Sequence, residues 1–253
     1  MKFTHLKLIA ILMRKINFRH WAWKHTFFAA LSMALFQPLF FSSVRLTGVA
    51  IGTVVTIGSS QVFAGLIDWI YFKNKPTRTW GIATLHAIVG CVLLFVNKGE
   101  ATVKPLGIAM ALCAGITFAI YTHVSKALLE KEDALSAVAM TFSISALLLC
   151  PISLVYGIEW VGQNANWLPL AFMGVFGTSI AYLLFLTGLQ RISSSSAVTL
   201  SLGEPLTAAI LGVFLVGEYL SLTSWVGVAM LLGGILVITF SGRAKKTNEI
   251  LAT

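Results

Sequence analysis

Charged side chains are scarce in this sequence of 253 residues. Only 11% of the residues are Asp, Glu, Lys or Arg, whereas 57% are hydrophobic, and the mean hydropathy is +0.88. A soluble globular domain carries about one quarter charged residues, because it needs them on its surface. The composition therefore excludes an ordinary soluble domain and predicts a membrane protein.

Cysteines and catalytic motifs are also few. Cys91, Cys113 and Cys150 are isolated, so they indicate neither a metal site nor a disulfide, and we expect them to act as small packing residues. We find no HExxH, no GxSxG and no phosphate-binding glycine loop. The sequence thus predicts no enzyme, no cofactor, no bound metal and no ATP-driven pump. Because no nucleotide-binding motif is found, we expect an ion gradient or substrate exchange to supply the energy for any transport.

Long hydrophobic runs fill most of the sequence. We count eight stretches of about 18 residues or more, the length at which an α-helix crosses the hydrocarbon core of a bilayer. They cover residues 25–44, 49–72, 79–96, 105–129, 135–156, 167–189, 195–216 and 222–241. Each run is continuous rather than alternating, which excludes a transmembrane β-barrel. We expect an all-α, polytopic bundle of about eight transmembrane helices.

The basic residues are distributed unevenly between the two ends of these spans. If both termini are cytoplasmic, the outside loops hold only Arg45, Lys98 and Lys104 of the 18 Lys and Arg residues. Cytoplasmic loops retain Lys and Arg in this way, and an even number of spans places both termini on one side. Residues 1–24 then form a basic cytoplasmic segment, and residues 242–253 form a cytoplasmic tail. The net charge of +9 therefore reflects the orientation of the protein in the membrane, for which we expect the bacterial inner membrane, and it does not indicate a nucleic-acid partner.

Two parts of the sequence resemble each other. The segment GSSQVFAGLI, residues 58–67, aligns with LGEPLTAAIL, residues 202–211, at a shift of 144 positions. The same shift pairs Gly90 with Gly234. The equivalent helices are an odd number of spans apart, so the second copy is inverted relative to the first. Inverted repeats place a binding site near the middle of the bilayer and permit alternating access.

The pattern LGEPLTAAILGVFLVGEYLSLTSWVGVAMLLGGILVI, with its counterpart around GSSQVFAGLI, resembles the EamA family of the drug/metabolite transporter superfamily. The resemblance extends from about Trp21 to Ser241. It implies a carrier of ten helices, built as two inverted repeats with a central cavity between the halves. Residues 25–98 then hold the last three helices of the first repeat, and residues 105–241 hold all five helices of the second. The first helix and most or all of the second are expected to be missing from this sequence.

Glu204 is the strongest candidate for a functional residue, because it lies near the centre of the span 195–216. A charged group there costs about 2.5 to 3.5 kcal/mol, so an intramembrane acid usually faces protein or a cavity. Pro205 cannot donate its amide and Gly203 permits close approach, so we expect a helix bend at this point. The carboxyl group could carry protons and couple transport to a proton gradient, or it could only shape the bend. The first repeat has no acid at the corresponding position, which is Ser60.

One face of the span 105–129 carries a polar stripe. Thr117, Tyr121 and Ser125 follow one another at a spacing of four residues, so they share this face. Such a stripe can line a water-filled pathway or form a helix contact. The resemblance to the EamA family favours the pathway, because it places this helix at the cavity.

Four more polar residues are candidates for the substrate pathway. Gln61 and Gln37 could hydrogen-bond a substrate, or they could tie helices together. Gln37 precedes Pro38, where we expect a second helix bend. Thr178 and Tyr182 belong to the span 167–189 and add a hydroxyl group each.

The sequence therefore predicts an integral membrane transporter of small metabolites, amino acids or drug-like compounds, which works as an exporter by alternating access. The alternative is a truncated or partner-dependent membrane subunit without independent transport, because part of the first repeat is not found. A pathway lined by Tyr, Ser, Gln and one acid suits many solutes. The substrate, the coupling ion, the direction of transport and the oligomeric state are left open.

Overall fold

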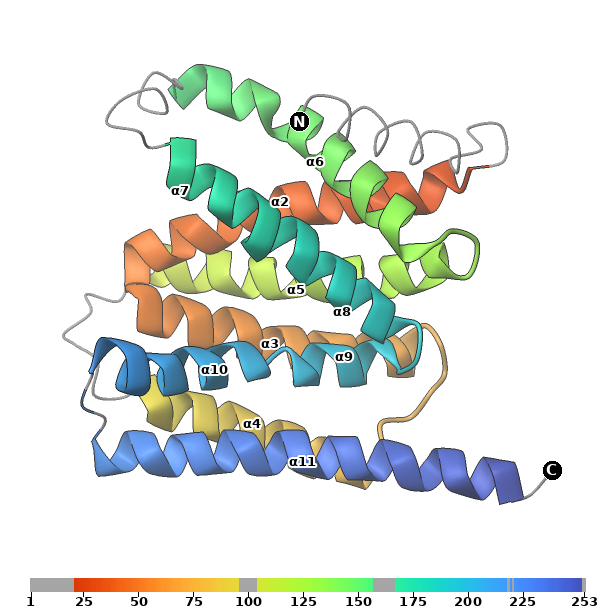
Figure 1. Cartoon of the computed structure of the whole chain (residues 1–253), viewed down its shortest axis with the longest axis vertical. Coiled ribbons are helices and arrows are strands. Elements are labelled where there is room, and N and C mark those ends of the chain that lie inside the picture. Colours follow the sequence, from red (N-terminus) through yellow and green to blue (C-terminus); the bar gives the residue numbers. More distant parts are fainter. Residues whose placement is uncertain (1–20, 96–103, 157–166, 218, 220, 252–253) are drawn as a thin grey trace. The chain divides into compact units, whose positions relative to one another are not determined.

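The computed structural model describes residues 21–95, 104–156, 167–217, 219 and 221–251. Regular structure in these residues is helical (Figure 1). The helices are α2 (Trp23–Thr47), α3 (Val49–Ile70), α4 (Arg78–Phe95), α5 (Pro105–Leu129), α6 (Ala134–Tyr156), α7 (Trp167–Phe172), the π-helix η2 (Met173–Ile180), α8 (Ala181–Leu189), α9 (Ser194–Leu200), α10 (Gly203–Leu211), the π-helix η3 (Gly212–Val216) and α11 (Leu222–Leu251). Most of the predicted basic segment 1–24 lies outside the described residues.

The predicted spans correspond to helices in the described part of the chain. Six helical stretches are long and apolar enough to cross a membrane: Trp23–Thr47, Ile51–Ile70, Pro105–Leu129, Ala134–Ser153, Trp167–Leu189 and Ser194–Leu215. Two shorter apolar helices, Arg78–Leu94 and Leu222–Ile238, account for the two remaining spans. A helix satisfies its backbone polar groups internally, as a lipid environment requires. The prediction of an all-α, polytopic membrane protein is confirmed.

Residue contacts divide the chain into two compact units. Unit 1 consists of Met1–Ala34 and His123–Arg191, and unit 2 consists of Leu35–Thr122 and Ile192–Thr253. Helices α2 and α5 each contribute one part to each unit. Each unit therefore combines residues from both predicted repeats.

Unit 1 is held together by polar and aromatic contacts between α2, α6 and α8. The Ser145 hydroxyl group of α6 donates a hydrogen bond of 2.7 Å to the carbonyl oxygen of Ala30 in α2. The rings of Phe142 in α6 and Tyr182 in α8 lie 4.7 Å apart, centroid to centroid. Hydrogen bonds between helices of this kind stabilise membrane bundles, in which lipid supplies little hydrophobic driving force.

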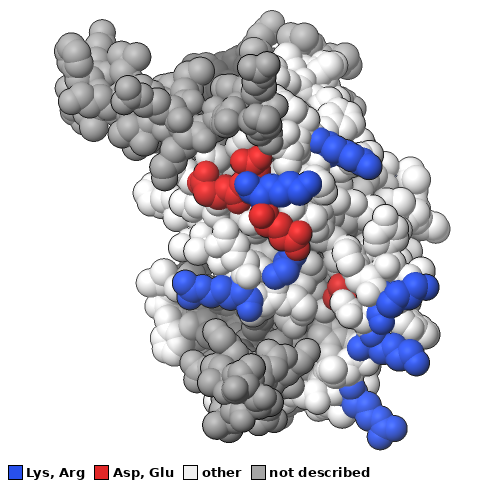
Figure 2. Space-filling view, turned by 90° about the vertical axis from the view of Figure 1, so that its right-hand side faces the viewer, with Lys and Arg blue, Asp and Glu red and all other residues white. Residues whose placement is uncertain are grey.

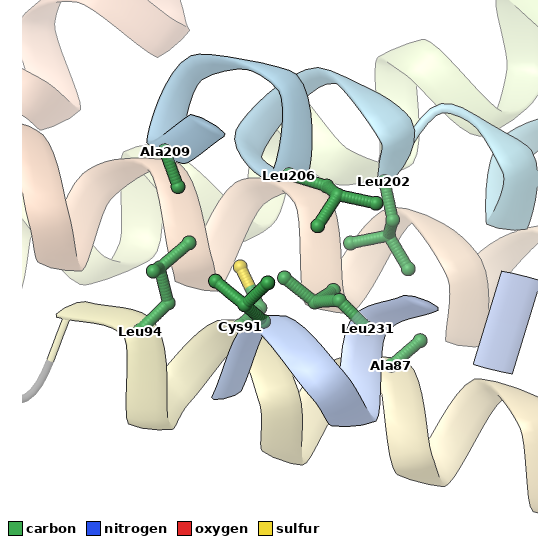
Figure 3. Packing of buried hydrophobic residues seen from close by; sticks show 8 residues of the cluster. Ala87, Cys91, Leu94, Leu202, Leu206, Ala209 and Leu231 are labelled. Atoms are coloured by element: carbon green, nitrogen blue, oxygen red, sulfur yellow. The ribbon is translucent and has the colours of Figure 1, made fainter. Parts of the chain in front are cut away.

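Unit 2 has an apolar core between α4, α10 and α11 (Figure 3). Its buried members are Ala87, Cys91, Leu94, Leu202, Leu206, Ala209, Val228 and Leu231. Cys91 is thus a packing residue, as predicted, whereas Cys113 and Cys150 are exposed. Val54 and Ile57 of α3 pack against the same core, so four helices meet there.

Helices α4 and α11 pack closely and run antiparallel in unit 2. A Cβ atom on Gly90 would lie 2.8 Å from the carbonyl oxygen of Gly227, and one on Gly234 would lie 2.8 Å from the carbonyl oxygen of Ala83. Only glycine permits such an approach of two backbones, as at other close helix contacts in membranes. A shift of 144 positions aligns Gly90 with Gly234 and Ala83 with Gly227. The contact between Gly90 and Gly227 is therefore equivalent to the contact between Gly234 and Ala83, with the roles of α4 and α11 exchanged.

Helices α3 and α5 also pack closely in unit 2, but they run parallel. A Cβ atom on Gly115 would lie 2.9 Å from the carbonyl oxygen of Thr56. Further along both helices, Ala119 and Ala64 form a buried cluster with Val198 of α9. Helix α9 therefore lies beside α3 and α5.

Charged side chains concentrate in connections between helices. Lys73 and Lys75 lie between α3 and α4, and Glu130, Lys131 and Glu132 lie between α5 and α6. Figure 2 shows Lys, Arg, Asp and Glu side chains on one face, surrounded by uncharged residues. This distribution is typical of helices that meet lipid along their length and water at their ends.

Candidate substrate pathway

The span that carries Glu204 is interrupted in its middle. Helix α9 ends at Leu200 and α10 begins at Gly203, with a turn at Ser201 and Leu202. Pro205 has no amide hydrogen, so the carbonyl oxygen of Ser201 cannot receive the usual helical bond from it. That oxygen instead accepts a 3.0 Å hydrogen bond from the amide of Glu204. The expected bend residues Gly203 and Pro205 thus lie directly after an interruption of the helix.

Glu204 lies in the first turn of α10, and its side chain is exposed. The N-terminus of a helix carries a partial positive charge, which favours a carboxylate. Pro205 and Leu206, which follow it, are buried. The side chain of Glu204 is therefore exposed beside the interruption, while Pro205 and Leu206 are buried.

A π-helix, which the sequence did not predict, occurs in the span 167–189. In η2 the Thr178 hydroxyl group donates to the carbonyl oxygen of Met173 at 3.3 Å, and the Ser179 hydroxyl group donates to that of Gly174 at 2.9 Å. Both bonds reach back five residues, the spacing of a π-helix. Such turns are frequent at functional sites.

The hydroxyl groups of Tyr182 and Thr178 have different hydrogen-bond partners within unit 1. Tyr182 is half-buried, and its hydroxyl group donates to Sδ of Met33 in α2 at 3.9 Å. Thr178 is also half-buried, but its hydroxyl group bonds within its own helix. Of the two residues, Tyr182 is therefore the one that joins helices.

The polar stripe of α5 is buried at two of its three positions. Tyr121 is 0% exposed and Ser125 is 1% exposed, whereas Thr117 is half-buried. The Thr117 hydroxyl group donates to the carbonyl oxygen of Ala114 at 2.8 Å, within the helix. The ring of Tyr121 lies 6.2 Å from that of Phe118. Tyr121 and Thr117 belong to unit 2 and Ser125 to unit 1.

The two glutamine candidates differ in burial. Gln61 is 0% exposed, and neither polar atom of its side chain has a hydrogen-bond partner among the described residues. Gln37 is half-buried, and α2 continues through Pro38 without an interruption. Gln61 is therefore the more unusual residue, since buried polar groups are nearly always paired.

Lys126 has a role that the sequence did not indicate. Its ammonium group donates a 2.7 Å hydrogen bond to the carbonyl oxygen of Leu189, the last residue of α8. The C-terminus of a helix carries a partial negative charge, so a cation there is stabilising. This contact joins α5 to α8 in unit 1, and it involves residues 63 positions apart in sequence.

The described helices and their apolar lengths define a polytopic, all-α membrane protein. The chain matches the EamA-like transporter family over residues 4–96 and 105–240, and it belongs to that family. The resemblance inferred from the sequence is thereby confirmed.

Two curated relatives illustrate this membership. The chain is 43% identical over 236 residues to the uncharacterized transporter YwfM of Bacillus subtilis (strain 168), which covers 93% of this chain and 80% of YwfM. It is 23% identical over 222 residues to the uncharacterized inner membrane transporter YicL of Salmonella typhimurium, covering 86% of this chain and 73% of YicL. These relatives indicate a membrane transporter rather than an enzyme.

A chain of known crystal structure has the same fold. The two chains superpose with a TM-score of 0.78 at 17% sequence identity, over 94% of this chain and 83% of the other. At this identity the likeness concerns the fold alone.

Proposed function

We propose that this protein is a carrier that exports small metabolites, amino acids or drug-like compounds by alternating access. It resides in the bacterial inner membrane with both termini in the cytoplasm. Two inverted repeats, residues 25–98 and 105–241, form its halves. The exchange of the α4 and α11 contacts under the shift of 144 positions supports this arrangement, because a two-fold axis between antiparallel helices produces such pairs.

The interruption of the helix directly before Glu204 carries the functional proposal. Carriers with inverted repeats bind substrates and ions at broken helices, where helix ends present their dipoles and backbone groups. Gly203, Glu204 and Pro205 place a carboxyl group at such an end. An exposed acid in the middle of a span must face water or protein rather than lipid, because lipid would make its charge expensive.

Glu204 couples transport to protons in this proposal. When the carboxyl group is open to the outside, it takes up a proton from the more acidic side. When it is open to the cytoplasm, it releases that proton, and the substrate leaves in the opposite direction. Thr117, Tyr121, Ser125, Gln61, Gln37, Thr178 and Tyr182 supply polar groups along the pathway.

Substrate-dependent proton movement tests this function. Everted membrane vesicles with the whole chain are acidified inside by respiration, and a pH-sensitive dye reports the gradient while amino acids and small metabolites are added singly. We expect at least one solute to dissipate the gradient in vesicles with this protein and not in vesicles without it. Glu204→Gln keeps the shape of the side chain but cannot exchange a proton, so this variant should lose the response while inserting normally.

The matched control is Glu130→Gln, the same chemical change at an exposed acid between α5 and α6. This variant should respond like the unchanged protein. A full response of Glu204→Gln would show that Glu204 only shapes the helix. A protein that moves none of the solutes, with or without a proton gradient, would contradict the carrier itself.

A further inference from the structure

Two contacts determine the register between α3 and α4 in unit 2. A Cβ atom on Gly58 would lie 3.8 Å from the side chain of Ile88, and one on Gly65 would overlap the indole ring of Trp80. Gly58, the earlier of the two α3 residues, thus contacts Ile88, the later of the two α4 residues. The two helices run antiparallel, with Gly58 opposite Ile88 and Gly65 opposite Trp80.

Gln61 and Thr84 lie between these two contacts. Gln61 is three residues after Gly58 and four before Gly65, so it lies on the face of α3 that packs on α4. Thr84 is four residues from both Trp80 and Ile88, so it lies on the facing surface of α4. The antiparallel register brings Gln61 and Thr84 to the same level, with Trp80 one turn away.

All three residues have buried polar atoms without partners. Gln61 is 0% exposed and Thr84 is 5% exposed. The Oε1 and Nε2 atoms of Gln61, Oγ1 of Thr84 and Nε1 of Trp80 have no hydrogen-bond partner among the described residues. A buried polar group without a partner loses the full free energy of its hydration, and such groups are rare in folded proteins. Four of them at one contact between two helices indicate a shared ligand.

The chemistry of these atoms selects an uncharged O–H group. Nε1 of Trp80 and Nε2 of Gln61 can only donate a hydrogen bond, Oε1 of Gln61 can only accept one, and the Thr84 hydroxyl group can do both. The ligand must therefore accept and donate at once. Ala87, about one turn from Thr84, belongs to the apolar core of unit 2, and Ile57, about one turn from Gln61, packs against it. An ion would lose its hydration beside them without a charged partner.

We propose that Gln61, Thr84 and Trp80 form a buried binding site for a small uncharged hydroxyl group, supplied by water or by the alcohol group of a solute. The site deepens the proposed function at Gln61, and only its solute form depends on transport. Water fits it because a buried water typically has two to four polar partners.

The equivalent described positions of the second half do not form such a site. The shift of 144 positions carries the three residues onto Pro205, Val228 and Ser224. Val228 belongs to the apolar core, and the Ser224 hydroxyl group donates to the carbonyl oxygen of Leu94 at 3.1 Å. The polar site is therefore specific to the contact between α3 and α4.

Thiol reactivity tests whether the site is hydrated. Thr84→Cys is made the only cysteine of the chain, and its rate of reaction with methyl methanethiosulfonate is measured in membranes. The matched control retains native Cys91 alone, which is 0% exposed in the apolar core on the same helix. A thiol in apolar surroundings reacts slowly because the thiolate is disfavoured there. We expect the Cys at position 84 to react at least about tenfold faster than Cys91, which corresponds to an activation free energy lower by about 1.4 kcal/mol.

The source of the hydroxyl group is distinguished by protection. Erythritol is a small uncharged polyol, and betaine is a solute without a hydroxyl group. The effects of the two solutes on the labelling rate are compared at equal osmolality. Slower labelling with erythritol alone identifies a solute hydroxyl group, and equal labelling identifies water. Both results support the site. A Cys at position 84 that reacts as slowly as Cys91 under all conditions would overturn it, whatever the outcome of the transport assay.

The sign of a stability change provides a second measurement. The double variant Gln61→Leu and Thr84→Val removes three of the four polar atoms and keeps similar volumes. If these atoms bind a hydroxyl group, their removal also expels that group and leaves Nε1 of Trp80 buried without a partner, which lowers the midpoint of unfolding in detergent titrations. If they are dry and unpaired, the apolar variant gains stability, because the cost of burying them disappears. A raised midpoint would therefore contradict the proposal.

Discussion

Glu204 and Lys126 show how single residues in this protein depend on helix ends. Glu204 lies at the N-terminus of α10, and Lys126 binds the last carbonyl oxygen of α8. Each charge has the sign that the nearby helix dipole favours. The sequence shows both residues within apolar spans, but it does not show that either one meets a helix end.

Lys126→Met tests the contribution of the contact at the end of α8. Methionine keeps the length of the side chain but removes the charge and the hydrogen bond to Leu189. We expect a loss of stability of about 1 to 2 kcal/mol, measured by detergent unfolding. Lys131→Met is the control, because Lys131 is exposed between α5 and α6. Equal unfolding midpoints for the two variants would mean that the cation at α8 contributes nothing.

The close contact between α4 and α11 is the most sharply defined feature at the scale of elements. Backbone atoms of one helix lie against glycines of the other, with Gly234 beside Ala83 and Gly90 beside Gly227. Neither helix can move away without separating the apolar core of unit 2, which both helices help to form. We infer that α4 and α11 move together in any transport cycle.

Gly234→Ala and Gly233→Ala form a matched pair for this contact. The added methyl group at Gly234 would lie 2.8 Å from the carbonyl oxygen of Ala83, whereas nothing lies within 4 Å of one at Gly233. We expect Gly234→Ala to destabilise the protein by about 1 to 3 kcal/mol through overpacking. Gly233→Ala should be neutral or stabilise by up to about 1 kcal/mol, because alanine favours the helix. Detergent unfolding of both variants checks this, and equal effects would show that the two helices are not in close contact.

At the scale of the whole molecule, the orientation in the membrane is a prediction from the distribution of charges. Single cysteines are placed at positions 98 and 164 on the expected outside and at 75 and 245 on the expected inside, in a chain without other cysteines. Positions 98 and 164 lie outside the described residues. An impermeant thiol reagent added to intact cells should label the first pair only, because loops rich in Lys and Arg stay in the cytoplasm. Labelling of the second pair alone would reverse the orientation.

The sequence by itself determined which segments become helices and which family the chain belongs to. Each span must satisfy its backbone polar groups internally and present apolar side chains to lipid, so its length and hydropathy are sufficient to identify it. The pattern around Glu204 and Pro205 was also sufficient to indicate the family, which the comparisons confirmed. These properties are local, and no knowledge of neighbouring helices is needed to infer them.

Only the tertiary structure decided what the polar residues on those helices face. The sequence offered Gln61 as a polar group of unknown surroundings, and it gave no reason to connect Gln61 with Thr84 or Trp80. That connection depends on Gly58 and Gly65, which bring α3 against α4 in one register. Register between helices depends on small residues that meet across the bundle, and a hydrophobic pattern within one helix does not encode it. The interruption at Ser201 and Leu202 is likewise a tertiary outcome, since proline permits either a bend or a break.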